Sequence, residues 1–405
     1  MNTKRLIGCL LALALCAVPA LAADLTIWHA YRGNEKAAFE KLVAEFNKAY
    51  AAKGIKAATL AVPYDAFADK ITASVPRGKG PDIVIFAQDR LGGWIEAGNT
   101  IAPIDFFLDK DTKARYIPST MDAMTYKGSV YGLPFNYKAV TMIYNKKLVP
   151  TPPKTSTELI AMAKKLTDPA SGRFGLAYTY ADFYYHSALM NAFGGAVFDK
   201  QRKPTIDTPQ NIKSLELMMK WADKDKVLPA EASSVLISQL FNSGKAAIVF
   251  NGPWFLGEID KSVDFGLAPL PKIDEAGGQP MKPWTTIEGL YIAAPSKNQE
   301  AAYEFVKFAT DLAGAKIMAL EGRQTPSNAK IYDDPAVAAD PILKAFRAQV
   351  ENSVPMPNYA EMAMFWSPVT TAMNALTRKS ATPAAAMAQA QKEVLERIAS
   401  LRKSP

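Results

Sequence analysis

The sequence predicts an α/β fold with mostly parallel sheets, and two features of the chain indicate it. Short apolar strands alternate with amphipathic helices along nearly the whole length. The apolar run at residues 83–86 is continuous, which is typical of a strand in a sheet covered on both faces. Because domains usually hold roughly 100–200 residues, a chain of 405 residues favours two domains or lobes.

The first elements follow directly after residue 23. A short strand is expected at residues 25–28 and a helix after it, with Asn34 as its N-cap and Gly54 as its stop. The apolar positions of that helix recur at helical spacing: Phe39, Leu42, Val43, Phe46 and Tyr50. Further strands are expected at residues 83–86, 140–144 and 246–250.

Three later helices have recognisable signals. Residues 155–158, TSTE, form a capping box that starts a helix. Residues 300–312 are expected to be one helix that places Phe305, Phe308 and Leu312 on one face. Near the end of the chain, Thr382 and Pro383 are the expected N-cap and first residue of a helix. The inner face of that last helix is formed by Met387, Val394 and Ile398.

The first 22 residues have the pattern of a secretory signal peptide. Lys4 and Arg5 precede an apolar stretch at residues 6–18, and residues 20–22 read ALA, a cleavage site. The apolar stretch is shorter than the roughly 20 residues of a membrane-spanning helix. A lipidation box at residues 6–9 lies too close to the N-terminus to leave an apolar region before it. We therefore expect cleavage after Ala22 and a periplasmic location.

Composition excludes several kinds of chemistry. Without the leader, 45 basic residues stand against 39 acidic ones, and they are dispersed rather than clustered, so nucleic-acid binding is not expected. Cys9 and Cys16 both lie in the leader, and the only histidines are His29 and His186. A His/Cys metal site and a cysteine nucleophile are thereby excluded. No glycine-rich phosphate loop or G-x-S-x-G elbow is present. The sequence therefore predicts no cofactor and no metal.

Polar and aromatic residues at strand ends predict a binding site. Asp89 and Arg90 lie just beyond the strand at 83–86, where open α/β sheets bind ligands. Alone, the pair is compatible with catalysis, a structural ion pair or two hydrogen-bonding arms. Aromatic residues fall near other strand ends and turns: Tyr31, Phe86, Tyr184, Trp254, Trp284 and Trp366. Aromatic faces combined with polar arms suit a sugar, whose C–H faces stack while its hydroxyls need hydrogen-bond partners.

Four stretches of the chain resemble a known family. GPDIVIFAQDRLGGW (80–94), MIYNKKLVPTPPKT (142–155), GKAAIVFNGPW (244–254) and MPNYAEMAMFW (356–366) occur in this order. They resemble the periplasmic maltose/maltodextrin-binding proteins and, more broadly, the extracellular solute-binding proteins of carbohydrate ATP-binding-cassette (ABC) importers.

The resemblance implies a monomeric, non-enzymatic carrier with a two-lobed periplasmic binding protein fold of type II-like topology. A di- or oligosaccharide would bind in the interlobe cleft, the lobes would close on it by a hinge movement, and the closed form would dock on permease subunits in the inner membrane. The implied crossings lie near residues 137–140, 285–289 and 336–341. The N-lobe would hold residues 23–136 and 288–337, and the C-lobe 138–286 and 338–405.

The resemblance also implies individual roles. Asp89 and Arg90 match a pair that hydrogen-bonds sugar hydroxyls, and Phe86 stands where the relatives have a ligand-facing tryptophan. Tyr184 matches a stacking tyrosine, with Asp182 at a position where the relatives have glutamate. Two stacking tryptophans are matched by Trp254 and Trp366.

Two positions depart from the family pattern. Arg32 and Gly33 replace an acid and a lysine, and Lys138 replaces a ligand-binding glutamate. An anionic sugar or a glycerophosphodiester would suit these bases. Alternatively, the bases point to solvent or pair with acids such as Asp182 or Glu288. A third possibility, a secreted glycan-cleaving enzyme, needs two carboxylates flanking the bond, and no motif nominates such a pair.

Overall fold

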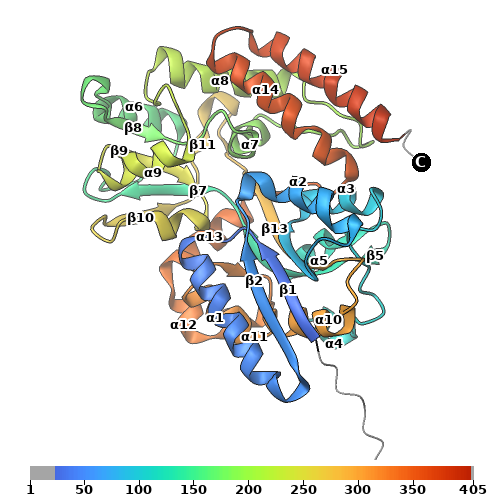
Figure 1. The fold of residues 1–405 in the computed structure, drawn as a ribbon. Coiled ribbons are helices and arrows are strands. Elements are labelled where there is room, and N and C mark those ends of the chain that lie inside the picture. The colour runs from blue at the N-terminus through green and yellow to red at the C-terminus, as the bar shows by residue number, and fades with distance from the viewer. Residues whose placement is uncertain (1–22, 403–405) are drawn as a thin grey trace, which may run out of the picture.

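The structure, a computed structural model, describes residues 23–402, so the expected signal peptide at residues 1–22 lies outside the described residues. It contains two separate large β-sheets, each flanked by helices (Figure 1). We call the unit built on the larger sheet the first lobe and the unit built on the smaller sheet the second lobe. The two-lobed α/β fold predicted from the sequence is confirmed.

The larger sheet contains seven strands in the order β14-β6-β13-β3-β1-β2, with β15 paired to β13. These strands are β1 (Ala23–His29), β2 (Ile55–Ala61), β3 (Ile83–Ala87), β6 (Gly132–Lys138), β13 (Trp284–Ile292), β14 (Thr325–Pro326) and β15 (Val354–Pro355). β1 pairs in parallel with β2 and β3, whereas β13 runs antiparallel to β3 and β6. Every residue of β3 is buried, as its continuous apolar run predicted.

The smaller sheet has the order β10-β7-β9-β8. Its strands are β7 (Thr141–Asn145), β8 (Phe174–Ala177), β9 (Ala246–Asn251) and β10 (Phe265–Ala268). Only β8 and β9 are parallel, while β7 runs antiparallel to both of its neighbours. Both large sheets are therefore mixed, with parallel pairing confined to strands that follow a helical crossover. Two short hairpins complete the strands: β4 (Thr125–Tyr126) with β5 (Ser129–Val130), and β11 (Lys272–Ile273) with β12 (Gln279–Pro280).

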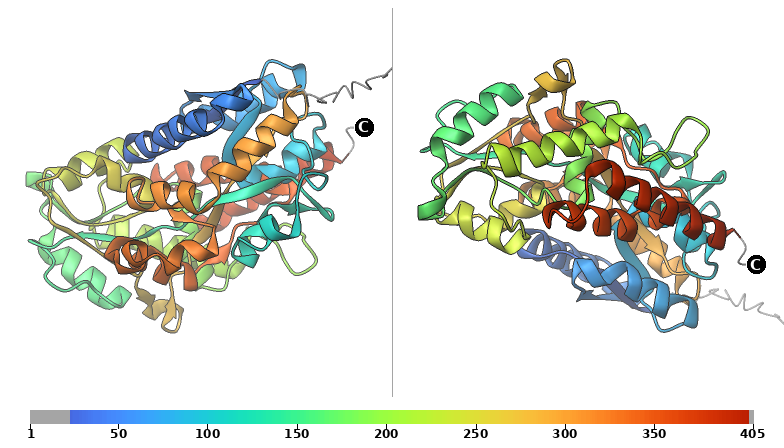
Figure 2. Two further views of the ribbon diagram at one scale, coloured as in Figure 1. Left: turned by 90° about the horizontal axis from the view of Figure 1, so that it is seen from below. Right: turned by 90° about the horizontal axis from the view of Figure 1, so that it is seen from above.

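Helices cover both sheets, as the two views of Figure 2 show. The chain forms α1 (Gly33–Ala49), α2 (Tyr64–Ser74), α3 (Leu91–Glu96), α4 (Lys110–Lys113), α5 (Pro118–Ala123), α6 (Ser156–Leu166), α7 (Phe183–Ala192), α8 (Pro209–Met219), α9 (Ser234–Asn242), α10 (Gln299–Ala309), α11 (Leu312–Leu320), α12 (Pro335–Ala339), α13 (Pro341–Glu351), α14 (Trp366–Thr377) and α15 (Pro383–Leu401). The last two, drawn in red, pack against each other, and α15 also contacts α8.

Most helix signals in the sequence are confirmed. Thr155 caps α6 by accepting a hydrogen bond from the Glu158 N–H, although the Glu158 carboxylate reaches back to Lys154 N–H rather than to Thr155. Thr382 caps α15, whose predicted inner residues are buried. The predicted N-cap of α1 was wrong: the Arg32 carbonyl accepts from Lys36 N–H, so the helix begins at Gly33 and Asn34 lies inside it.

The helix expected at residues 300–312 is two helices. Asp311 caps α11 by accepting from Gly314 N–H, which ends α10 at Ala309 and starts a new helix at Leu312. Leu312 is 48 % exposed and does not share the buried face of Phe305. The apolar spacing predicted continuity, but the capping carboxylate interrupts it.

Candidate functional site

Asp89 and Arg90 occupy the 3₁₀ turn Gln88–Arg90, directly after β3. The Asp89 carboxylate is 3 % exposed, and its Oδ2 accepts a 3.0 Å hydrogen bond from Trp366 Nε1. Arg90 Nε lies 3.1 Å from the same oxygen, and the guanidinium stands 5.7 Å from the centre of the Trp366 ring. Burial raises the pKa of Asp89, while Arg90 and the Trp366 N–H act in the opposite direction. The acid and the base therefore form one unit with an aromatic side chain from α14.

Four of the predicted aromatic residues form one continuous surface, which we call the aromatic wall: Tyr184, Trp254, Trp284 and Trp366. Trp366 packs edge-to-face on Trp284 at 6.0 Å, and Tyr184 lies 6.5 Å from Trp284 and 6.0 Å from Trp254 between ring centres. Trp284 is buried, and the other three are half-buried. Rings that keep part of their faces open offer stacking surface to a sugar.

Local backbone features position the wall. Asp182 caps α7 by accepting a 2.7 Å hydrogen bond from Tyr184 N–H, and the Tyr184 hydroxyl accepts from Thr286 Oγ1 at 3.0 Å. Trp254 folds back over Gly252, where an added Cβ would lie 2.2 Å from the indole ring. Only glycine permits this close approach of ring to backbone. By capping α7, Asp182 fixes the backbone position of Tyr184, and Gly252 does the same for the Trp254 ring.

Phe86 differs from its expected place in the site. It is 4 % exposed and is stacked between Phe67, at 4.8 Å with an interplanar angle of 2°, and Tyr64, at 5.1 Å and 30°. The open ring on this side is Tyr64, at the start of α2. Phe86 is thus a supporting ring inside the first lobe, because Tyr64 covers the face that was expected to meet the ligand.

Lys138 is buried in a cluster of opposite charge. Its Nζ lies 2.7 Å from Glu35 Oε1 and 2.9 Å from Glu288 Oε1, and it stands 5.2 Å from the centre of the Tyr31 ring. The Tyr31 hydroxyl donates to Glu288 Oε2 at 3.0 Å. Burial alone would lower the pKa of Lys138, but the two carboxylates outweigh it and the pKa is raised. We call Tyr31, Glu35, Lys138 and Glu288 the charge cluster.

The other base is paired as well. Arg32 Nε lies 2.8 Å from Glu258 Oε1, with half of the arginine side chain exposed. Glu258 ends the 3₁₀ turn Pro253–Glu258 of the second lobe, which also carries Trp254. Arg32 therefore joins the two lobes. The sequence left open whether Arg32 and Lys138 face solvent, pair with acids or await an anionic ligand. In the structure both pair with acids, and one of these acids is the expected Glu288.

Gln88 is a site residue that sequence reasoning missed. It is fully buried, its Nε2 donates to Met356 O at 3.0 Å, and its Oε1 accepts from Ile287 N–H at 2.7 Å. Ile287 belongs to β13, and Met356 directly follows β15, the strand that pairs with β13. Gln88 thereby fixes the end of β3 to the crossing strands, immediately before Asp89. Its position beside Asp89 is the only sequence signal of this role.

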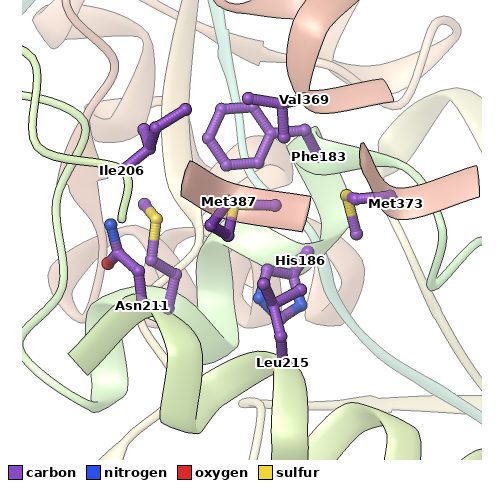
Figure 3. Close-up of a pocket in the computed structure, with 9 residues that line it drawn as sticks. Phe183, His186, Ile206, Asn211, Leu215, Val369, Met373 and Met387 are labelled. Carbon is purple, nitrogen blue, oxygen red and sulfur yellow. The ribbon is translucent and has the colours of Figure 1, made fainter. Parts of the chain in front are cut away.

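A small cavity lies behind Phe183 on the far side of α7 (Figure 3). Its volume is about 10 Å³, which is about the size of one water molecule. His186 Nε2 is 2.9 Å from Ser214 Oγ, whose own proton goes to Asn211 O, so the imidazole donates from Nε2. Burial lowers the pKa of His186 to about 3. The cavity is too small for a sugar ring and is not the ligand site.

Between residues 23 and 402, no cluster of three or more His, Cys, Asp or Glu residues has the arrangement of a metal site. In the same part of the chain, none of the helices combines the length and apolar character needed to span a membrane.

Residues 32–316 match the family of bacterial extracellular solute-binding proteins. This match covers more than half of the chain. The chain belongs to this family.

Relatives of this solute-binding protein agree with the match. This chain is 32 % identical over 383 residues to the maltotriose-binding protein of Pyrococcus abyssi, and the match covers 92 % of this chain and 82 % of the relative. A maltose/maltodextrin-binding domain from Bdellovibrio bacteriovorus, solved with maltotriose bound, has a TM-score of 0.87 at 26 % identity over 93 % of this chain and all of the other. The maltotriose-binding protein of Thermus thermophilus, also with maltotriose, has a TM-score of 0.85 at 26 % identity, covering 92 % of this chain and all of the other.

The site of this solute-binding protein is thus assembled from both lobes. Among the candidate residues, Asp89 and Arg90 lie in the turn after β3 and Tyr64 begins α2, whereas Tyr184, Trp254 and Trp366 lie on α7, the turn Pro253–Glu258 and α14. A polar pair faces an aromatic surface, which is an arrangement that recognises a polyhydroxylated ligand with apolar faces.

Proposed function

We propose that this protein binds a maltodextrin-type oligosaccharide, such as maltotriose, between its two lobes and delivers it to an ABC importer. The observation that carries the proposal is the hydrogen bond between Trp366 and Asp89, which joins the aromatic wall to the polar pair. In this arrangement sugar rings stack on the wall while Asp89 accepts and Arg90 donates hydrogen bonds to hydroxyls. Solved relatives of similar fold hold maltotriose.

Individual contacts are part of the proposal. Asp89 and Arg90 contact sugar hydroxyls, and Tyr184, Trp254 and Trp366 stack on sugar rings. Asp182 and Trp284 support these rings, since the first caps α7 and the second is buried behind the wall. Tyr31, Lys138 and Glu288 form the floor near the crossings, and Arg32 closes the rim.

We propose the lobe boundaries 23–136 with 288–337 and 138–286 with 338–405. Three features support them. β6 of the larger sheet ends at Lys138 and β7 of the smaller sheet begins at Thr141. The pairing of β13 with β3 starts at Glu288, opposite Ala87. α12 packs on α11, whereas α13 contacts β10 of the second lobe.

The location and partners follow from the proposed function. The expected leader with cleavage after Ala22 would send a monomeric carrier to the periplasm, where it would meet permease subunits of the inner membrane. Membership in an extracellular solute-binding family supports this location. A carrier role also makes the protein a binding protein rather than an enzyme, so incubation with maltodextrins should yield no new reducing ends.

No observation favours the anionic ligand. Lys138 is flanked by two carboxylates and Arg32 by one, so neither base has its charge free for a phosphate or a carboxylate of a ligand.

Isothermal titration calorimetry with maltose, maltotriose, an acidic disaccharide and glycerophosphocholine tests the proposal. We expect maltotriose to bind with a Kd in the micromolar range, about −8 kcal/mol, and Trp254→Ala to weaken it at least roughly tenfold. Binding of the anionic compounds alone would overturn the proposal.

A further inference from the structure

Tyr64 is a large aromatic residue that remains 59 % exposed at the first position of α2. Most other rings on the larger sheet are buried in its core. An exposed tyrosine alone needs no explanation. Its surroundings are what distinguish this one, because its ring packs on the strand that leads into Asp89 and Arg90.

The Tyr64 ring is backed by two further rings. It stacks on Phe86 at 5.1 Å, and Phe86 stacks in turn on Phe67 at 4.8 Å in nearly parallel planes. Phe67 is fully buried, and it lies one helical turn after Tyr64 on α2. One face of Tyr64 is therefore held by a column of aromatic rings, and the remaining surface is open. A ring fixed in this way presents stacking area with little conformational entropy left to lose.

Tyr64 is also linked to the polar pair by the strand on which it packs. Its ring stacks on Phe86 of β3, and the turn that carries Asp89 and Arg90 follows this strand directly. The Asp89 carboxylate of this turn accepts a hydrogen bond from Trp366, which belongs to the aromatic wall. Tyr64 is therefore connected to the polar pair through Phe86 and β3, and the polar pair is bonded to the aromatic wall through Trp366.

Resting on the proposed function, we infer that Tyr64 is the sugar-stacking residue of the first lobe and helps to set the preference for a maltodextrin. Its open face packs on one glucosyl ring, opposite the rings that the second lobe provides. Its hydroxyl adds a hydrogen-bond partner beside Asp89 and Arg90. Phe86, at the position where sequence similarity implied a ligand contact, supports Tyr64 from behind.

The test uses the full mature protein and maltotriose as the probe. Tyr64→Ala should weaken maltotriose binding roughly tenfold or more in calorimetry, because it removes the stacking ring. Tyr64→Phe and Tyr64→Trp keep a ring on the Phe86 column and should restore affinity to within about threefold of the wild type. Phe106→Ala is the matched control, since Phe106 is an aromatic residue of the first lobe that is 93 % exposed and has its ring against Phe107.

The outcomes separate this inference from the proposed function. If the wild type binds no maltodextrin, the proposed function fails. If the wild type binds maltotriose and Tyr64→Ala binds it equally well, only the role of Tyr64 is refuted. A loss in Tyr64→Ala that neither Phe nor Trp restores would also refute stacking. Thermal unfolding of each variant should give an unchanged Tm, and a lowered Tm with lost affinity in Tyr64→Ala alone would indicate a structural role instead.

Discussion

Trp366 Nε1 donates a hydrogen bond to Asp89 Oδ2 across 3.0 Å, although 277 positions separate the two residues in the chain. Asp89 extends from the end of β3 in the first lobe, and Trp366 begins α14 in the second. The bond therefore ties the turn after β3 to the first residue of α14. Trp366 and Arg90 both contact Oδ2 of Asp89, so the carboxylate is held from one side and Oδ1 is the oxygen offered to a ligand hydroxyl.

A variant that removes the Trp366 N–H but keeps an aromatic ring tests whether this hydrogen bond orients Asp89. Trp366→Phe should weaken maltotriose binding by about tenfold, because a hydrogen bond to a charged group contributes about 1.5–3 kcal/mol and part of that is regained from water. Calorimetry measures the change. Trp221→Phe, at a fully buried tryptophan outside the aromatic wall, should change stability without changing affinity. Equal affinity in Trp366→Phe and wild type would show that the bond does not orient Asp89.

The charge cluster makes Lys138 important for stability. Lys138→Met should lower the free energy of unfolding by about 3–5 kcal/mol, because it leaves the buried carboxylates of Glu35 and Glu288 without their cation. Urea denaturation measures this loss. Lys146→Met removes an exposed pair with Asp264 and should leave the midpoint of urea unfolding nearly unchanged.

The same cluster allows a partial rescue. Adding Glu35→Gln to Lys138→Met removes one of the two unpaired charges and should recover part of the lost stability. A double variant no more stable than Lys138→Met would argue against an electrostatic origin.

The effect of the ion pair between Arg32 and Glu258 on binding should depend on salt. Arg32→Gln should weaken maltotriose binding by up to about fivefold at low ionic strength, since an exposed ion pair contributes at most about 1 kcal/mol and this one joins the lobes. In 1 M NaCl the difference should disappear, because charges are screened over roughly 3 Å there. Glu258→Gln should reproduce both results, and the double variant should add nothing. A loss that persists in high salt would mean that Arg32 contacts the ligand directly.

Acid should destabilise the protein through its buried histidines. The pKa of His186 is lowered to about 3 and that of His29 to about 4, mainly by burial, whereas both stand near 6.5 in the unfolded chain. The unfolded state therefore binds more protons between these values, so stability is full above pH 6.5 and falls as the pH drops toward 3. His186 alone should account for on the order of 4 kcal/mol of this loss.

His186→Gln separates this contribution from that of the carboxylates. The variant should be less stable at pH 7 and lose less stability between pH 6.5 and 4 than the wild type, as measured by urea denaturation at several pH values. Parallel pH profiles for the two proteins would contradict a neutral, buried His186.

Much of the site was predictable because it lies at strand ends. Asp89 and Arg90 follow an apolar run, and Trp254 follows another with a glycine and a proline between, so position alone indicated a shared edge. The aromatic residues Tyr184, Trp284 and Trp366 were predicted as well and lie together. Whether they contact a sugar stays a prediction.

The residues that were missed depend on tertiary approach. Glu35 meets Lys138 across 103 positions, and this pairing needs α1 to pack beside the end of β6. Phe86 is covered by Tyr64, a residue that the sequence analysis did not single out, because the start of α2 lies over β3, and no periodicity reveals this packing. Helix boundaries failed where a single side chain or carbonyl determined the cap, as at Asp311 and Arg32.

β13 carries alternate residues Trp284, Thr286 and Glu288 on one face before its register shifts at Gly289. Trp284 is part of the aromatic wall, Thr286 donates to the Tyr184 hydroxyl and Glu288 is part of the charge cluster, so one backbone sets their spacing. Substituting any of them disturbs the others, which makes this strand a poor place to retarget the protein by engineering. Tyr64 and Trp254 lie on separate short segments, and a library restricted to these two positions is the economical starting point for a sensor with a new sugar preference.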